Sequence, residues 1–95
     1  MNIDHNIYNE EISIAAYYIW NQEHSYENLC WFLAERQLYV ERNFTSAKKD
    51  DIRDRAYYIY KEHPPYDILC WFIGELDLYI KRNTSFRTFN TLFSK

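Results

Sequence analysis

Two glutamates at matched positions are the residues with the clearest potential for acid–base chemistry. Glu35 and Glu75 lie forty residues apart, and each follows a tryptophan by four positions. Two carboxylates that meet in a folded protein shift each other's pKa, which lets one donate a proton and the other accept it. On a helix, however, Glu35 lies near Arg42 and Glu75 lies near Arg82, which predicts structural ion pairs. We expect a protein that is not an enzyme, and a small enzyme that uses the paired glutamates is kept as an alternative.

The other reactive side chains form no pattern typical of a metal or nucleophile site. His5, His24 and His63 are scattered, and their spacing to Cys30 and Cys70 does not match a zinc site. No serine or threonine lies in a glycine-flanked turn, as a catalytic nucleophile would require. We therefore expect no metal, no cofactor and two buried, reduced thiols, since free cysteine packs as a small apolar side chain.

These residues recur because the chain contains one pattern twice. The residues that return unchanged forty positions later are Ile12, Ala16, Tyr17, Tyr18, Ile19, Tyr26, Leu29, Cys30, Trp31, Phe32, Glu35, Leu38, Tyr39, Arg42 and Asn43. A repeat of this length is one supersecondary unit, which buries its apolar face against a copy of itself. The sequence predicts a single domain, residues 1–95, with internal repeats at 10–43 and 50–83.

Composition points to a compact helical protein. Of the 95 residues, 47% are hydrophobic and 20% aromatic, with one glycine and two prolines, which argues against both a disordered chain and a loop-rich β fold. The net charge is −3, the first 45 residues being acidic and the remainder mildly basic. No long basic run supports a nucleic-acid partner, and no apolar run is long enough to span a membrane. A cytoplasmic protein is expected.

Helical periodicity divides each repeat into two segments. We expect helices at 10–22, 26–42, 48–62 and 66–82, with Asn9, Ser25 and Ser46 as N-caps. The predicted fold is all-α: two similar helical hairpins packed as a four-helix bundle with pseudo-twofold symmetry. Each second helix is expected to pack on the first helix of its own hairpin and on the other repeat. A short amphipathic C-terminal helix or tail, residues 84–95, is expected to cover the bundle.

Aromatic side chains are too numerous for the expected core. On each second helix a narrow apolar stripe remains beside the main one, and it faces the remaining helix, a second subunit or another protein. In each tyrosine pair one ring must point away from the core, because adjacent helical positions diverge by about 100°. We therefore predict a non-catalytic protein–protein interaction module, a small regulator or inhibitor, that binds another protein or a second copy of itself. The predicted contact residues are Trp31, Leu38, Trp71, Leu78, Tyr18 and Tyr58.

The alternative partner is a single-stranded nucleic acid. Lys48, Lys49, Arg53 and Arg55 would contact phosphates, and an adjacent tyrosine would stack on unpaired bases. Salt-dependent binding would distinguish this regulator from a protein-binding module.

The repeated pattern resembles a bacterial family of short helical hairpins that is catalogued as a domain of unknown function. The matching residues of the first copy are Ile12, Ala16, Tyr17, Ile19, Trp20, Trp31, Ala34, Glu35 and Leu38. The second copy departs from the pattern at Tyr60, where the family has tryptophan, and at Gly74, where it has alanine. Family members carry a glycine-containing loop between the helices, which both copies lack. The resemblance implies helical hairpins over residues 10–83 and supplies no chemistry.

Overall fold

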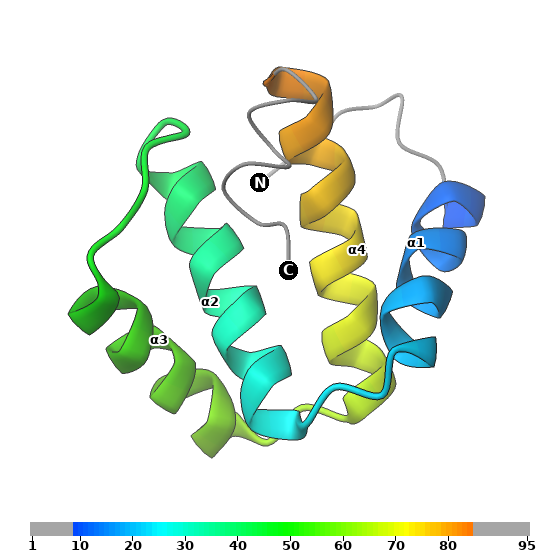
Figure 1. Cartoon of the computed structure of the whole chain (residues 1–95), viewed down its shortest axis with the longest axis horizontal. Helices are drawn as coiled ribbons and strands as arrows, with labels where there is room; N and C mark the ends of the chain where they lie inside the picture. The colour runs from blue at the N-terminus through cyan, green and yellow to red at the C-terminus, as the bar shows by residue number, and fades with distance from the viewer. Residues whose placement is uncertain (1–8, 85–95) are drawn as a thin grey trace.

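The computed structural model describes residues 9–84, which form four α-helices and no strand (Figure 1). The helices are α1 (Asn9–Asn21), α2 (Tyr26–Glu41), α3 (Lys49–Glu62) and α4 (Tyr66–Asn83). The all-α fold class is therefore confirmed, and each predicted helix end lies within one residue of the observed one. The expected C-terminal helix lies outside the described residues.

The structure confirms one of the predicted N-caps, Ser25, and contradicts another, Ser46. The Ser25 side chain accepts a hydrogen bond of 3.1 Å from the Asn28 amide and caps α2 as predicted. The prediction that Ser46 caps α3 is wrong, because Lys48 is the N-cap residue and makes no side-chain cap. Acidic side chains in the first turn, Asp50 and Asp51, still place negative charge at the positive end of α3.

The first helix of each repeat packs on the second helix of the other repeat. α1 packs on α4 and α3 packs on α2, while α2 and α4 contact each other at the centre (Figure 1). Among the described residues, α1 makes no packing contact with α2, nor α3 with α4, although each pair is adjacent in sequence. The prediction that each second helix packs on its own first helix is therefore wrong. Both short connections contain a left-handed residue, Glu23 with φ 57° and His63 with φ 58°, and they lead into extended N-cap residues, Ser25 and Pro65.

Gly74 allows the exchanged pair α1 and α4 to pack closely. A Cβ atom at this position would lie 3.1 Å from the backbone nitrogen of Ala16 and 3.2 Å from the Cβ of Ala15. These distances are shorter than ordinary van der Waals contacts, so the missing side chain is what lets the two helices approach. The departure from alanine at this position thus has a packing reason.

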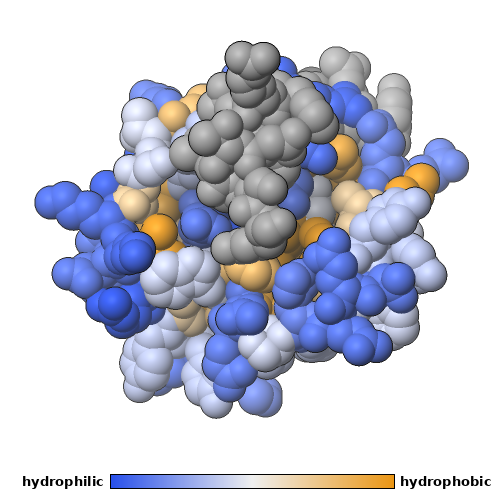
Figure 2. Space-filling model, in the orientation of Figure 1, coloured by the Kyte–Doolittle hydropathy of each residue, from blue (hydrophilic) through white to orange (hydrophobic). Residues whose placement is uncertain are grey.

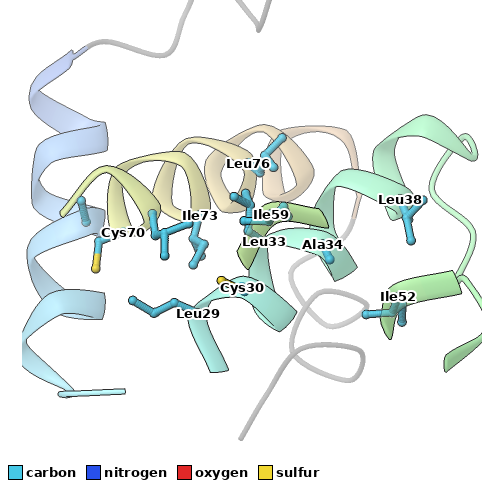
Figure 3. Packing of buried hydrophobic residues seen from close by; sticks show 12 residues of the cluster. Leu29, Cys30, Leu33, Ala34, Leu38, Ile52, Ile59, Cys70, Ile73 and Leu76 are labelled. Atoms are coloured by element: carbon cyan, nitrogen blue, oxygen red, sulfur yellow. The ribbon is translucent and has the colours of Figure 1, made fainter. Parts of the chain in front are cut away.

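The core lies between the two second helices and extends under both first helices (Figure 3). Leu29, Leu69 and Ile73 are at most 1% exposed and form its centre. Cys30 and Cys70 are buried, unpaired thiols, as predicted. Burial raises the pKa of both thiols, which favours their protonated form.

Side-chain contacts between the repeats obey the pseudo-twofold relation. The Tyr26 hydroxyl donates to the Pro64 carbonyl, and the equivalent Tyr66 hydroxyl donates to the His24 carbonyl, both at 2.5 Å. Two ion pairs are also equivalent: Arg42 with Asp51 at 2.8 Å, and Arg82 with Glu11 at 2.5 Å. Each of these four contacts joins one repeat to the other, so neither repeat is complete alone.

One buried ion pair breaks this symmetry at the centre of the bundle. Arg36 on α2 is 6% exposed, and its Nε donates to Asp77 Oδ1 on α4 at 2.7 Å. The equivalent positions carry Leu76 and Gln37, so the pair occurs on one side of the pseudo-twofold axis. Burial raises the pKa of Asp77, and the Arg36 guanidinium offsets part of this rise.

Candidate functional site

Two equivalent grooves flank the bundle, each between a first helix and the second helix of the other repeat. Their volumes are about 370 Å³ and about 380 Å³. The α1/α4 groove is lined by Ser13, Ala16, Tyr17, Trp20, Asp67, Ile68, Cys70 and Trp71. The α2/α3 groove is lined by Glu27, Cys30, Trp31, Arg53, Ala56, Tyr57 and Tyr60. The helix exchange builds both grooves, because it places aromatic residues of one repeat against a tryptophan of the other.

The paired tyrosines lie on the outer faces of the first helices. Tyr17 and Tyr18 are 57% and 62% exposed, and the equivalent Tyr57 and Tyr58 are 63% and 64% exposed. The prediction that one ring of each pair points away from the core is confirmed, and the second ring is exposed as well. Buried residues at the first-helix positions Ile12, Ala16, Ile52 and Ile59 already provide the inward contact. Both rings are therefore left for solvent or for a partner.

The tryptophan–leucine stripe of α2 faces the remaining helix, the first of the three neighbours considered for it. The stripe of α2 lies under α3, where Leu38 is 7% exposed and belongs to the same core as Ile52. Leu38 is thus out of reach of a partner, and Leu78 is half-buried. Trp31 and Trp71 are half-buried, pack against the core and form one wall of each groove. Of the six predicted contact residues, Tyr18 and Tyr58 present the most surface.

Sequence reasoning did not single out Trp20 or Ile14 as surface residues. Trp20 is 52% exposed and Ile14 is 59% exposed on the outer side of α1. The Trp20 ring stacks on Tyr17 with a centroid separation of 6.3 Å and an interplanar angle of 28°. The sequence of α1 could have indicated this exposure, because apolar residues lie on every side of the helix. A helix that packs on one neighbour buries only one of these sides.

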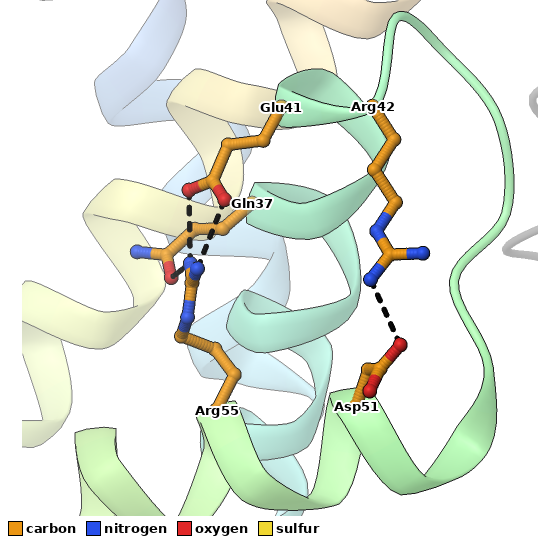
Figure 4. A network of polar contacts seen from close by, with 5 residues as sticks. All are labelled: Gln37, Glu41, Arg42, Asp51 and Arg55. Atoms are coloured by element: carbon orange, nitrogen blue, oxygen red, sulfur yellow. Dashed lines mark hydrogen bonds and ion pairs between the residues drawn. The ribbon is translucent and has the colours of Figure 1, made fainter.

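The four basic residues proposed for phosphate binding do not form a free patch. Arg55 donates two parallel hydrogen bonds of 2.9 Å to Glu41 and a third, of 3.0 Å, to Gln37 (Figure 4). This contact lowers the pKa of Glu41. Arg53 pairs with Asp50 at 2.8 Å, while Lys48 and Lys49 are exposed at the start of α3. Two of the four cations are therefore already engaged by carboxylates.

The two glutamates have different surroundings. Glu35 accepts a hydrogen bond of 3.2 Å from Arg36, whereas Glu75 lines a hollow of about 570 Å³ between α2, α3 and α4. The arginines expected to pair with them bind other acids, Arg42 binding Asp51 and Arg82 binding Glu11.

The described histidines lie in the turns between helices. His24 hydrogen-bonds Gln22 at 2.6 Å, and His63 lies against the ring of Tyr26 with centroids 5.7 Å apart. His5 lies outside the described residues. No group of three histidine, cysteine or acidic residues with metal-binding geometry occurs within residues 9–84.

None of the four described helices is long and apolar enough to cross a membrane. Comparison of the chain with protein-family models, with curated proteins and with solved structures finds no significant match. The resemblance to the family of helical hairpins therefore stays a prediction.

Proposed function

We propose that this protein is a non-catalytic interaction module that binds a protein partner through the outer aromatic faces of α1 and α3. The observation that carries the proposal is the exposure of four tyrosines, Tyr17, Tyr18, Tyr57 and Tyr58, at 57–64% on two equivalent helices. Tyrosine brings a large contact area at a small cost in conformational entropy, which is why it is enriched at interfaces. Within this proposal, the module acts as a small regulator or inhibitor of the protein that it binds.

The arrangement of the helices supports a bivalent mode of binding. α1 and α3 lie on opposite flanks of the bundle, with α2 and α4 between them (Figure 1). A partner with two copies of one site, or two copies of a partner, can therefore engage both flanks. Such double engagement raises the overall affinity without new contacts.

Affinity capture from the cells that produce the protein tests this proposal. The test variant replaces Tyr17, Tyr18, Tyr57 and Tyr58 by serine, and circular dichroism confirms that it is folded. Since hot-spot residues each contribute more than about 1 kcal/mol, we expect at least about ten-fold less of a discrete partner on the variant than on the wild-type protein. Equal recovery on both would contradict the proposal.

Light scattering in parallel separates a foreign partner from a second copy. A molar mass that rises with concentration for the wild-type protein, and not for the serine variant, would identify the chain itself as the partner. A control variant replaces Thr45 and Ser46, which are exposed in the α2–α3 connection, by alanine.

A further inference from the structure

We propose that the α1/α4 groove binds a cationic side chain, arginine or lysine, from a basic segment of the partner. This inference rests on the proposed function, because the groove adjoins the exposed tyrosines of α1, and it specifies the partner's chemistry. The two grooves have nearly equal volumes, but only the α1/α4 groove combines aromatic walls with an acid and no base.

The walls of the α1/α4 groove are aromatic. Tyr17 and Trp20 form a stacked pair on α1, and Trp71 forms the opposite wall on α4. The floor is made of small side chains, Ala16 and Cys70, which are 9% and 1% exposed. Tyrosine and tryptophan side chains suit such a site, because the face of an aromatic ring has a negative electrostatic potential that attracts guanidinium and ammonium groups.

The charge of the groove complements a cation. Asp67 lies one helical turn before Trp71 on α4, and both line the groove. An adjoining hollow of about 280 Å³ shares Trp20 and adds a second acid, Glu23. Neither lysine nor arginine lines either hollow, although His24 lies beside Glu23 in the lining of the adjoining one. The last turn of α1 contains no base.

The α2/α3 groove provides an internal comparison. Glu27 takes the place of Asp67, but Arg53 takes the place of Ser13 and brings its own cation to the lining. Figure 2, in the orientation of Figure 1, shows strongly hydrophilic and paler residues interspersed on both flanks of the bundle. Because Arg53, which also pairs with Asp50 at 2.8 Å, already lies in this lining, an added cation is expected to be less favoured here than in the α1/α4 groove.

Fluorescence anisotropy with a defined probe tests the inference. The probe is a fluorescein-labelled eight-residue peptide that alternates arginine and alanine, and its control carries citrulline, the uncharged analogue, in place of arginine. We expect the arginine peptide to bind and the citrulline peptide not to bind. Because an exposed ion pair contributes up to about 1 kcal/mol, Asp67→Asn is expected to weaken binding about five-fold. Trp20→Ala should weaken it by a similar factor through loss of the cation–π contact.

Matched variants distinguish the groove from general attraction to an acidic protein. Glu27→Gln removes the same charge from the equivalent position, and Tyr60→Ala removes the residue equivalent to Trp20. Both should leave the affinity within a factor of about two. Equal weakening by Asp67→Asn and Glu27→Gln, equal binding of the two peptides, or no binding would each overturn the inference.

The two proposals fail in different ways. If the serine variant loses its captured partner but the peptide shows no dependence on Asp67, the aromatic interface stands and the cationic specificity is refuted. If capture is unchanged in the serine variant, the proposed function itself is refuted, whatever the peptide does.

Discussion

Tyr26 of the first repeat and Tyr66 of the second make equivalent hydrogen bonds, each to a backbone carbonyl of the other repeat. Each hydroxyl leaves the first turn of a second helix and reaches a carbonyl in the turn of the other repeat. The two interhelical turns are therefore held against each other at one end of the bundle. This reciprocal contact joins the two repeats at their interhelical turns. In the expected hairpins, each second helix would instead have turned back there onto its own first helix.

The reciprocal hydrogen bonds should contribute equally to stability. Tyr26→Phe and Tyr66→Phe are each expected to lower the free energy of unfolding by about 1 kcal/mol, because each removes one partly buried neutral hydrogen bond. Urea denaturation monitored by circular dichroism measures both changes. Tyr58→Phe, at a ring that is 64% exposed, should have no effect. A loss at only one of the two equivalent tyrosines would contradict the pseudo-twofold account.

Gly74 should tolerate no branched side chain. Gly74→Val is expected to destabilise the fold by about 2 kcal/mol, because even a Cβ atom would lie 3.1 Å from the α1 backbone. The same denaturation experiment measures the loss. Gly74→Ala should cost less, since its gain of about 1 kcal/mol in helix propensity offsets part of the crowding. Unchanged stability in the valine variant would show that α1 does not pack on α4 at this point.

The Glu41–Arg55 pair should stabilise the fold more at neutral pH than in acid. Arg55 lowers the pKa of Glu41 below the usual value of a glutamate, so the unfolded chain binds the proton more tightly than the folded one. The resulting stabilisation of the fold is fully present above the pKa that Glu41 has in the unfolded chain. It is lost as the pH falls through the pKa that Glu41 has in the folded chain. The Glu41 side chain is 54% exposed, which screens the pair and limits its contribution.

Denaturation of Glu41→Gln at two pH values checks this sign. We expect a loss of about 0.5 to 1 kcal/mol at neutral pH and a smaller loss at about pH 3. Asp54→Asn, which removes a charge from an exposed position of α3, is the control. If Glu41→Gln lowers the free energy of unfolding equally at both pH values, the charge of Glu41 does not contribute to stability.

A glycine should stabilise the first turn. Glu23 has a left-handed backbone with φ 57°, which costs a residue with a side chain about 1 kcal/mol or more. Glu23→Gly is therefore expected to raise the free energy of unfolding by about 0.5 to 1 kcal/mol, after the entropy of the unfolded chain is counted. Thermal denaturation measures the gain. Gln22→Gly, at a neighbour without positive φ, should be destabilising, and a similar loss at Glu23 would contradict the turn geometry.

Local structure could be predicted from this sequence, but the pairing of helices could not. Apolar spacing fixes where the helices begin and end, and the buried thiols follow from their place on the apolar arc. The inward stripe of α1, with Ile12 and Ala16, is identical to that of α3, with Ile52 and Ala56. Pairing within a repeat and pairing between repeats therefore bury the same residues of these stripes. The contacts beside them differ, since Ala15 lies against Gly74 whereas Arg55, at the equivalent position, binds Glu41.

The candidate site also depends on which first helix packs on which second helix. Leu38 becomes a core residue because α3 covers its stripe, whereas the exposed rings of Tyr17 and Trp20 become groove walls because α1 packs beside Trp71. Composition alone indicates a surplus of aromatic side chains. Only the packing shows which of them remain at the surface.

Site-specific photo-crosslinking tests the aromatic interface most directly. Benzoylphenylalanine would replace Tyr18 on one face, Tyr58 on the other and Ser46 as an exposed control. We expect an adduct of one discrete mass from the two tyrosine positions upon irradiation in the producing cells. It should be lost when Tyr17 and Trp20 are also replaced, by serine and alanine, in the Tyr18 probe. Adducts equally frequent at Ser46, or absent from both tyrosine positions, would contradict an interface on these helices.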